Sequence, residues 1–283
     1  MGRVLVLIKT IVFLVLTAEM LLGSVGIANA SSIRSPESFY TNSLSEMFIK
    51  PYLPVHTIKM PILVYHYVEY VVDPKDPTRK LLATEPHILD EQLETLLSNG
   101  YEFVNFKDLE NFFDGSALPP KKPIMLTFDD GYEDFYTDAM PIIKKYKVKA
   151  VQYVISGVIG KPNYMSKAQL KEVIDTGLVE IGAHTVDHYN LLKLSLNDSL
   201  AQIRQSKEAL EKEFDISVTT FAYPYGHYNE SLERLVGEAG FDTAVTMDRG
   251  YTVKKAEQYS LRRIRPGIAI GEGLINELFS VDN

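Results

Sequence analysis

The chain has 283 residues, a formal net charge of −8 at pH 7, 46% hydrophobic residues and 23% charged residues, which is ordinary for one large globular α/β domain or two small ones. No long basic run is present, so a nucleic-acid partner is disfavoured, because such partners need a basic surface that neutralises phosphates. There is no cysteine, which excludes disulfides, thiolate nucleophiles and cysteine-type zinc sites.

The N-terminus has the layout of a secretory signal. A basic start precedes the apolar stretch 11–22, and small residues at 28–30 supply a cleavage site. We therefore predict a signal peptide over residues 1–30, cleaved after Ala30, and a secreted or cell-envelope location. An uncleaved membrane anchor is the alternative. Glu19 argues against it, because a carboxylate inside a bilayer is costly.

The rest of the chain divides into a connecting segment and one domain. Residues 31–58 are rich in Ser, Pro and isolated apolar residues without a clear period, which predicts a linker or a segment draped over the domain surface. The domain is expected over residues 59–283.

Within this domain, short apolar runs alternate with amphipathic stretches. The runs are unbroken, as in parallel strands covered on both faces. The predicted strands are 61–65, 123–128, 150–155, 179–183, 219–223, 243–246 and 261–265, and the predicted helices lie near 86–99, 106–113, 137–147, 166–176, 197–213 and 229–239. Repeated strand–helix units predict a barrel or a doubly wound sheet. In both folds, chemistry gathers at the carboxyl ends of the strands.

Two adjacent carboxylates follow the strand 123–128. This strand runs into Asp129, Asp130 and Gly131. Adjacent carboxylates at a strand end are poorly suited to a structural role, since they repel each other and neither is easily buried. Gly131 permits a sharp turn that lets both side chains face one site. A turn rich in Asp and Gly is the alternative interpretation of these residues alone.

Two histidines follow the strand 179–183. His184 and His188 are four positions apart, so a helical continuation would place both on one face, with Cβ atoms about 5–6 Å apart. Asp187 could orient one imidazole or merely face solvent. Two His and one Asp, with a position left for water, make a catalytic metal site, and the other Asp is then available as a general base. A chance pair of histidines is the alternative.

These segments resemble the motifs of a known family. Residues 127–131 (Thr-Phe-Asp-Asp-Gly) and 184–188 (His-Thr-Val-Asp-His) are similar to the first two motifs of the polysaccharide deacetylases, the NodB-homology group of carbohydrate esterase family 4. Residues 221–226 (Phe-Ala-Tyr-Pro-Tyr-Gly) resemble the third motif. The stretch 60–66 is similar to a secreted subgroup that includes the poly-N-acetylglucosamine deacetylases. Order and spacing match over about residues 59–267.

The resemblance implies an α/β fold of the distorted (β/α)7 barrel type. It also implies a hydrolase of linear, non-peptide amides that removes N-acetyl groups from an extracellular or cell-wall polysaccharide. The polysaccharide is the only partner implied, with association with a membrane or cell wall left open. Peptidoglycan, chitin-type oligomers, poly-N-acetylglucosamine and acetylated xylan all stay open as substrates.

The resemblance also assigns roles to individual residues. It implies that Asp129 is the general base, and that Asp130, His184 and His188 bind a divalent metal, most simply Zn²⁺. It further implies that Tyr225 offers its backbone N–H to the oxyanion.

The sequence departs from the family in two places. The third motif usually carries an arginine that steadies the base, and here that position is Ala222. Arg263 resembles a position that supplies this charge in related subgroups, with a surface arginine as the alternative. The late histidine that protonates the leaving amine has no counterpart after His227. His66, at the end of the first strand, is the preferred candidate for this acid, and His227 is the second.

These departures leave a second function open. A degenerate member of the family could bind glycan without turning it over. The complete set of Asp129, Asp130, His184 and His188 favours the enzyme, because a binding module has no need for both a metal and a spare base.

Overall fold

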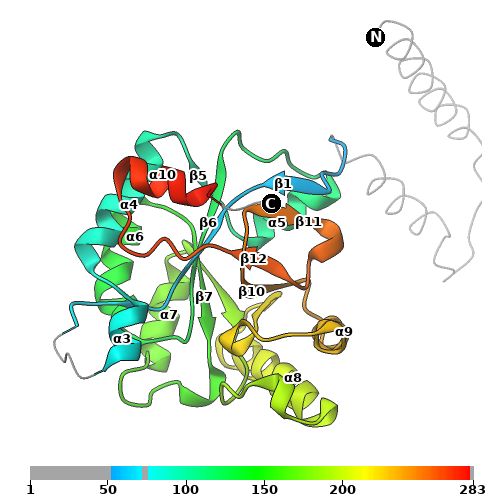
Figure 1. Cartoon of the computed structure of the whole chain (residues 1–283). Coiled ribbons are helices and arrows are strands. Elements are labelled where there is room, and N and C mark those ends of the chain that lie inside the picture. Colours follow the sequence, from blue (N-terminus) through cyan, green and yellow to red (C-terminus); the bar gives the residue numbers. More distant parts are fainter. Residues whose placement is uncertain (1–51, 72–75, 281–283) are drawn as a thin grey trace, which may run out of the picture. The chain divides into compact units, whose positions relative to one another are not determined.

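Seven parallel strands form the centre of the structure, a computed structural model in which residues 52–71 and 76–280 are described. In order around the sheet they are β12 (Leu261–Arg263), β10 (Thr243–Arg249), β9 (Thr220–Ala222), β8 (Val179–Ala183), β7 (Ala150–Val154), β6 (Pro123–Phe128) and β2 (Ile62–Tyr65). The ring closes just after β12. There Ile264 donates its N–H to the carbonyl of Ile62 at 2.8 Å and accepts from Val64 at 2.9 Å. The predicted distorted (β/α)7 barrel is confirmed (Figure 1).

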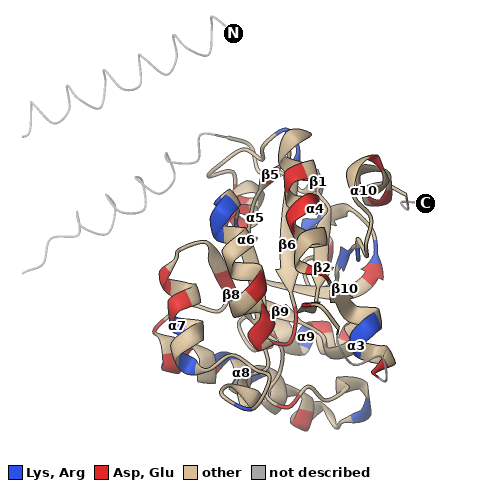
Figure 2. Ribbon diagram, turned by 90° about the vertical axis from the view of Figure 1, so that its left-hand side faces the viewer, with Lys and Arg blue, Asp and Glu red and all other residues tan. Residues whose placement is uncertain are grey.

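Helices cover the outside of the barrel (Figure 1). They are α4 (Pro86–Ser98), α5 (Phe106–Asp114), α6 (Met140–Tyr146), α7 (Lys167–Asp175), α8 (Leu196–Phe214) and α9 (Glu230–Glu238), so all six predicted helices are confirmed. A π-helical turn, Phe135–Ala139, leads into α6, and the helical segment that contains it begins at residue 133, four residues before the predicted start at 137. Charged residues of both signs lie along the outer helices (Figure 2).

The barrel interior is filled by apolar side chains and closed at one end by α5. Ile62, Met125 and Val151 are fully buried inside the barrel, in one cluster with the apolar face of α5. Near the amino end of β8, Glu180 accepts a hydrogen bond from the backbone N–H of Phe106, the first residue of α5, at 2.9 Å. Because α5 covers the amino ends of the strands, the carboxyl ends form the open mouth of the barrel.

Several short elements were not predicted. They are the antiparallel pair β1 (Thr57–Lys59) and β11 (Thr252–Lys254), the parallel pair β3 (Tyr67–Val68) and β4 (Ala83–Thr84), the strand β5 (Glu102–Phe103), and the helices α3 (Pro77–Leu82) and α10 (Gly271–Leu278). Strands of two or three residues are too short to show a period. In the described part of the chain, no helix is both long and apolar enough to span a bilayer.

The predicted signal peptide over 1–30 lies outside the described residues, as does the predicted linker up to residue 51. The end of that linker runs along α5, where the N–H of Val55 donates to the carbonyl of Phe112 at 3.0 Å. Thr57 already belongs to β1.

A buried glutamine on α4 joins the C-terminal segment to the barrel. Gln92 is fully buried. Its Oε1 accepts from the hydroxyl of Tyr65 at 2.9 Å, and its Nε2 donates to the carbonyls of Gly267 and Ala269 at 3.0 and 2.8 Å. This side chain therefore ties the segment that follows β12 to both α4 and β2.

We expect Gln92→Leu to lower the free energy of unfolding by about 1–3 kcal/mol, because it leaves buried donors and acceptors without partners. Urea denaturation measures this change. Glu94→Leu, on the exposed face of the same helix, is the control and should change stability by no more than about 0.5 kcal/mol. Equal stability of the Gln92→Leu and Glu94→Leu proteins would contradict a joining role for Gln92.

Candidate active site

The carboxyl ends of the barrel strands meet around one cavity of about 440 Å³. The predicted site residues that line it are His66 after β2, Asp129 and Asp130 after β6, His184 and His188 after β8, and Tyr225 after β9. Arg263 lies behind Asp129, in hydrogen-bonding contact with it. The structure thus brings these seven predicted residues together.

Asp129 is held by a buried arginine. The two side chains are almost fully buried, and the guanidinium of Arg263 donates to both carboxylate oxygens at 2.8 and 2.7 Å. Arg263 also donates to the hydroxyl of Thr127 at 3.1 Å and to the carbonyl of Thr246 at 2.8 Å. Burial alone would raise the pKa of Asp129, but the charge and hydrogen bonds of Arg263 outweigh it and hold this pKa well below its usual range. Asp129 is therefore ionised at neutral pH, and Arg263 is not a surface residue.

Asp130 faces the two histidines instead. Its φ is 77° and that of Gly131 is 81°, so the chain reverses through two successive left-handed residues directly after β6. The reversal begins one residue earlier than the sequence indicated, at a position where a side chain is uncommon. Oδ1 of Asp130 lies 3.3 Å from Nε2 of His184 and 3.4 Å from Nε2 of His188. Although buried, this oxygen has no hydrogen-bond partner among the described residues.

The histidines reach this point by a turn rather than a helix. Residues 184–188 are not helical, contrary to the expectation, and both Thr185 and His188 have a positive φ, 64° and 58°. The turn still places the two imidazole rings 4.8 Å apart, centroid to centroid. Nδ1 of His184 donates to the carbonyl of Ala222 at 2.8 Å, which leaves its Nε2 free as a ligand. Burial lowers the pKa of His188 to about 4, so this ring is neutral at neutral pH, as a ligand must be.

Asp130, His184 and His188 fit a divalent metal ion. Their three donor atoms lie within 4.8 Å of one another. Two bonds of about 2.1 Å at a tetrahedral angle put their ligand atoms about 3.4 Å apart, and the separations of 3.3 and 3.4 Å from Asp130 match this value. A buried carboxylate oxygen without a partner is also costly, which favours a bound cation beside it. Three protein ligands leave a fourth position for water.

His66 lies on the other side of Asp129. Its Nε2 is 3.9 Å from Oδ2 of Asp129, and its Nδ1 is buried without a hydrogen-bond partner in the described part of the chain. Burial lowers the pKa of His66, against the opposing effect of the nearby carboxylates. His227 instead lies near the surface, with Nδ1 2.9 Å from Nδ2 of Asn190, and does not line the cavity. Of the two candidates for the acid, only His66 faces the site.

Tyr225 occupies a tight turn at the cavity mouth. Its φ is 61°, and Gly226 follows with a φ of 72°. A Cβ on Gly226 would lie 2.4 Å from the Cβ of Met247, so only glycine lets this turn pack against β10. Tyr225 is 58% exposed, and its ring lies edge to face with the ring of His188, at 4.7 Å between centroids. The turn therefore forms one rim of the site.

The opposite rim contains aromatic residues that the sequence analysis missed. Tyr67 and Tyr132 line the cavity and stack at 4.0 Å between ring centroids, and Tyr164 stacks on Tyr132 at 5.1 Å. The guanidinium of Arg79, on α3, lies 4.6 Å from the centroid of Tyr67 and completes the column. Tyr67 directly follows His66 in the sequence, and Tyr132 directly follows Gly131. This adjacency to predicted site residues could have identified both tyrosines as part of the site.

Arg265 is a second residue that the sequence analysis missed. It lines the cavity and is half-buried, and no hydrogen bond or ion pair joins it to any other described residue. It lies at the end of the predicted strand 261–265, so the strand-end rule could have marked it.

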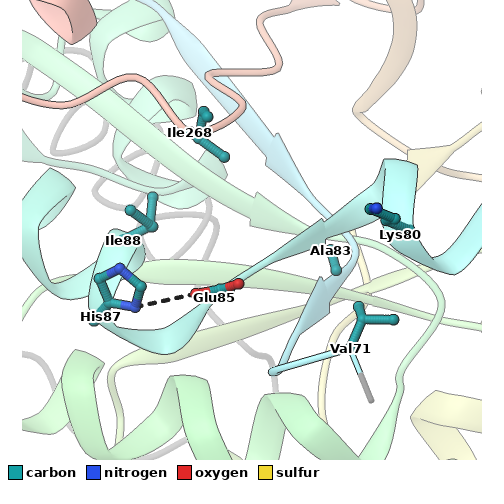
Figure 3. A pocket seen from close by; sticks show the side chains of 7 residues that line it. All are labelled: Val71, Lys80, Ala83, Glu85, His87, Ile88 and Ile268. Atoms are coloured by element: carbon teal, nitrogen blue, oxygen red, sulfur yellow. Dashed lines mark ion pairs between the residues drawn. The ribbon is translucent and has the colours of Figure 1, made fainter. Parts of the chain in front are cut away.

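A second cavity of about 430 Å³ lies beside β4 and the start of α4 (Figure 3). The side chains of Glu85 and His87 form an ion pair at 3.4 Å in its wall, which also includes Ile268 of the C-terminal segment. None of the paired strand-end carboxylates and histidines lines it, which separates this cavity from the candidate active site.

Comparisons with known proteins agree with the geometry. The sequence model of the polysaccharide deacetylase family matches residues 117–244. YxkH of Bacillus subtilis (strain 168), named for the same family, is 31% identical over 213 residues, which cover 75% of this chain and 73% of YxkH. The poly-β-1,6-N-acetyl-D-glucosamine N-deacetylase of Staphylococcus aureus (strain N315) is 30% identical over 188 residues, 62% of this chain and 64% of that enzyme.

A solved structure supports the same assignment. The deacetylase PplD of Streptococcus pyogenes, in complex with acetate, superposes with a TM-score of 0.72 at 31% identity, over 80% of this chain and 99% of PplD. The resemblance found in the sequence motifs is thereby confirmed. The chain belongs to the polysaccharide deacetylase family, which includes N-deacetylases, hydrolases that act on amide bonds.

Proposed function

We propose that this protein removes N-acetyl groups from an extracellular polysaccharide with the help of a bound divalent metal ion. The observation that carries the proposal is the pairing of Asp129 with the buried Arg263. This pair lies directly beside Asp130, whose buried Oδ1 has no hydrogen-bond partner among the described residues. A glycan-binding protein would need neither an ionised base nor an open metal site next to it. The geometry therefore favours the enzyme over a degenerate binder.

Asp130, His184 and His188 are the residues that would hold the metal. Zinc suits their mixed nitrogen and oxygen donors. When bound, such an ion supplies Lewis-acid chemistry, which polarises the acetyl carbonyl and makes water acidic enough to lose a proton to a weak base.

Asp129 is the proposed base. Its low pKa makes it weak but keeps it ionised, and the two hydrogen bonds from Arg263 fix the orientation of its carboxylate. It would take the proton of the attacking water. The ion pair with Arg263 therefore makes Asp129 a weaker base but keeps its carboxylate charged and fixed in position.

His66 is the proposed acid. The amine of the sugar leaves readily only when it is protonated, and His66 lines the cavity beside Asp129. The backbone N–H of Tyr225 would donate to the oxygen that becomes negative when the carbonyl is attacked.

The substrate that we would test first is poly-β-1,6-N-acetyl-D-glucosamine, because the Staphylococcus aureus relative is named for it. Peptidoglycan, chitin-type oligomers and acetylated xylan are the comparison substrates. The predicted signal peptide over 1–30 supports action outside the cell, on a glycan of the envelope.

Removal of the metal should abolish acetate release. We expect release from at least one of the four glycans by purified protein, loss after chelation, and recovery when Zn²⁺ is added back, because without the Lewis acid the carbonyl is not activated. A coupled acetate assay measures this. Tight metal binding without release from any of the four glycans would favour the binder instead.

Substitutions should separate the two adjacent aspartates. Asp130→Ala is expected to lose metal and activity together. Asp129→Asn should keep the metal and lower kcat by about 10²–10⁴-fold, the usual contribution of a general base. Metal titration by calorimetry and acetate release together distinguish the two outcomes. Near-normal turnover of Asp129→Asn at saturating metal would refute its role as the base.

The pH profile should identify the acid. An acid acts only when protonated, and burial lowers the pKa of His66, so kcat should decline as the pH rises through a range below the ordinary imidazole pKa of about 6.5. His66→Gln should lower kcat by about 10²-fold or more and flatten this decline, without changing metal affinity. His227→Gln is the matched control and should behave like the unchanged protein. The reverse result would make His227 the acid, and loss of metal from His66→Gln would make His66 a ligand.

A further inference from the structure

Two of the three candidate metal ligands depend on a turn without regular structure. Residues 184–188 connect β8 to the surface, and both Thr185 and His188 adopt positive φ values that are uncommon for residues with a side chain. Such a backbone conformation persists only where the surroundings hold it. The contacts of this turn therefore decide where the ligand atoms lie.

The two imidazoles differ in their own support. His184 is almost fully buried and its Nδ1 donates to the carbonyl of Ala222, so its ring is fixed directly. The ring of His188 is 26% exposed, and its nitrogens have no hydrogen-bonding partner in the described part of the chain, although Nε2 lies 3.4 Å from Oδ1 of Asp130. Besides its contact with the ring of Tyr225, the orientation of the His188 ring depends on the backbone of the turn.

One side chain from α8 holds this backbone. Oε1 of Gln202 accepts hydrogen bonds from two consecutive backbone N–H groups, those of Val186 at 3.1 Å and Asp187 at 2.9 Å. Nε2 of Gln202 donates to Oδ2 of Asp187 at 2.8 Å. Asp187 is exposed, in line with one of the two alternatives from the sequence, but it also anchors the turn to α8.

The loop after β7 supports the same turn from the other side. The N–H of Ser156 donates to the carbonyl of Thr185 at 3.1 Å, and that of Gly157 donates to the carbonyl of Val186 at 2.9 Å. A Cβ on Gly157 would lie 2.5 Å from this last oxygen, so the two segments are in close contact. The loop satisfies the carbonyls of the turn, while the N–H groups of Val186 and Asp187 depend on Gln202.

We propose that Gln202 is a positioning residue that sets the metal affinity of the site by clamping the 184–188 turn, with Asp187 as its partner. The inference rests on the proposed metal site and adds to it a residue on the outer helix α8, which does not line the active-site cavity. Without the clamp, the turn would sample other conformations, and His188 would meet the metal in only a fraction of them.

The first test compares Gln202→Ala with Gln205→Ala, an exposed position on the same helix. Calorimetric Zn²⁺ titration should show about 10–100-fold weaker binding for Gln202→Ala, the usual loss when an outer partner of a metal ligand is removed. Gln205→Ala should bind like the unchanged protein. Hydrogen exchange of the backbone amides in 184–188, measured without metal, should quicken in Gln202→Ala alone. Hydrogen exchange reports on the clamp whether or not metal binds.

The second test exchanges the polar groups of the pair. Gln202→Glu keeps an acceptor for both N–H groups but sets a second carboxylate against Asp187, so metal affinity should fall. Asp187→Asn alone should have little effect, because its amide oxygen can still accept from Gln202. The double variant, Gln202→Glu with Asp187→Asn, restores a donor and an acceptor in reversed positions. Its metal affinity and its hydrogen-exchange rates in 184–188 should return to within about threefold of those of the unchanged protein.

The outcomes separate the clamp from the proposed function. If the unchanged protein bound no metal, the proposed function would be wrong, and the exchange data would still decide whether Gln202 holds the turn. Unchanged metal affinity and unchanged exchange in Gln202→Ala would overturn the clamp while leaving the metal site intact. A double variant as weak as Gln202→Glu would also overturn it, because the loss would then not come from the pairing with Asp187.

Discussion

The buried ion pair between Asp129 and Arg263 links the closure of the barrel to the chemistry at its mouth. Arg263 ends β12, the strand after which the ring closes, and its guanidinium reaches across to the first residue after β6. Between them, the hydroxyl of Thr127 accepts from Arg263 at 3.1 Å and donates to the carbonyl of Leu63, on β2, at 2.7 Å. Removing one member of a buried pair typically costs about 3–5 kcal/mol. The environment of the proposed base is therefore also part of what holds the seam together.

This arrangement explains how two adjacent aspartates can have different roles. Two carboxylates facing one another would repel, and one would take up a proton. Here the left-handed backbone at Asp130 and Gly131 turns the second carboxylate away from the first. Asp129 is paired with the positively charged guanidinium of Arg263. Asp130 instead faces two imidazole nitrogens, and its buried Oδ1 has no hydrogen-bond partner among the described residues. The difference arises from their surroundings, because the residues themselves are chemically identical.

The sequence predicted the parts of the fold and site that depend on neighbours along the chain. Most of the barrel strands coincide with short, largely apolar runs, and the strand-end rule located His66, Asp129 and His184 without any knowledge of contacts. What it could not predict depends on residues far apart in sequence. Gln202 meets the turn only because α8 packs beside β8, and the α3 segment with β3 and β4 is too short to show a period. The helical spacing of His184 and His188 was misleading, because a turn with two positive φ angles produces the same proximity.

The structure explains why Ala222 can stand where the family usually has an arginine. Its carbonyl orients His184, a task for the backbone that any residue can perform, while the charge that the family usually places there comes instead from Arg263 on a different strand. The base is thus fixed by β10 and β12, whereas the histidine turn is fixed by the loop after β7 and by α8. Because these supports share no side chain, the position of the base and the position of the histidine turn are held separately. The loss of the arginine from the third motif is then compatible with a working active site, since an arginine from β12 restores the charge without disturbing the residues that would hold the metal.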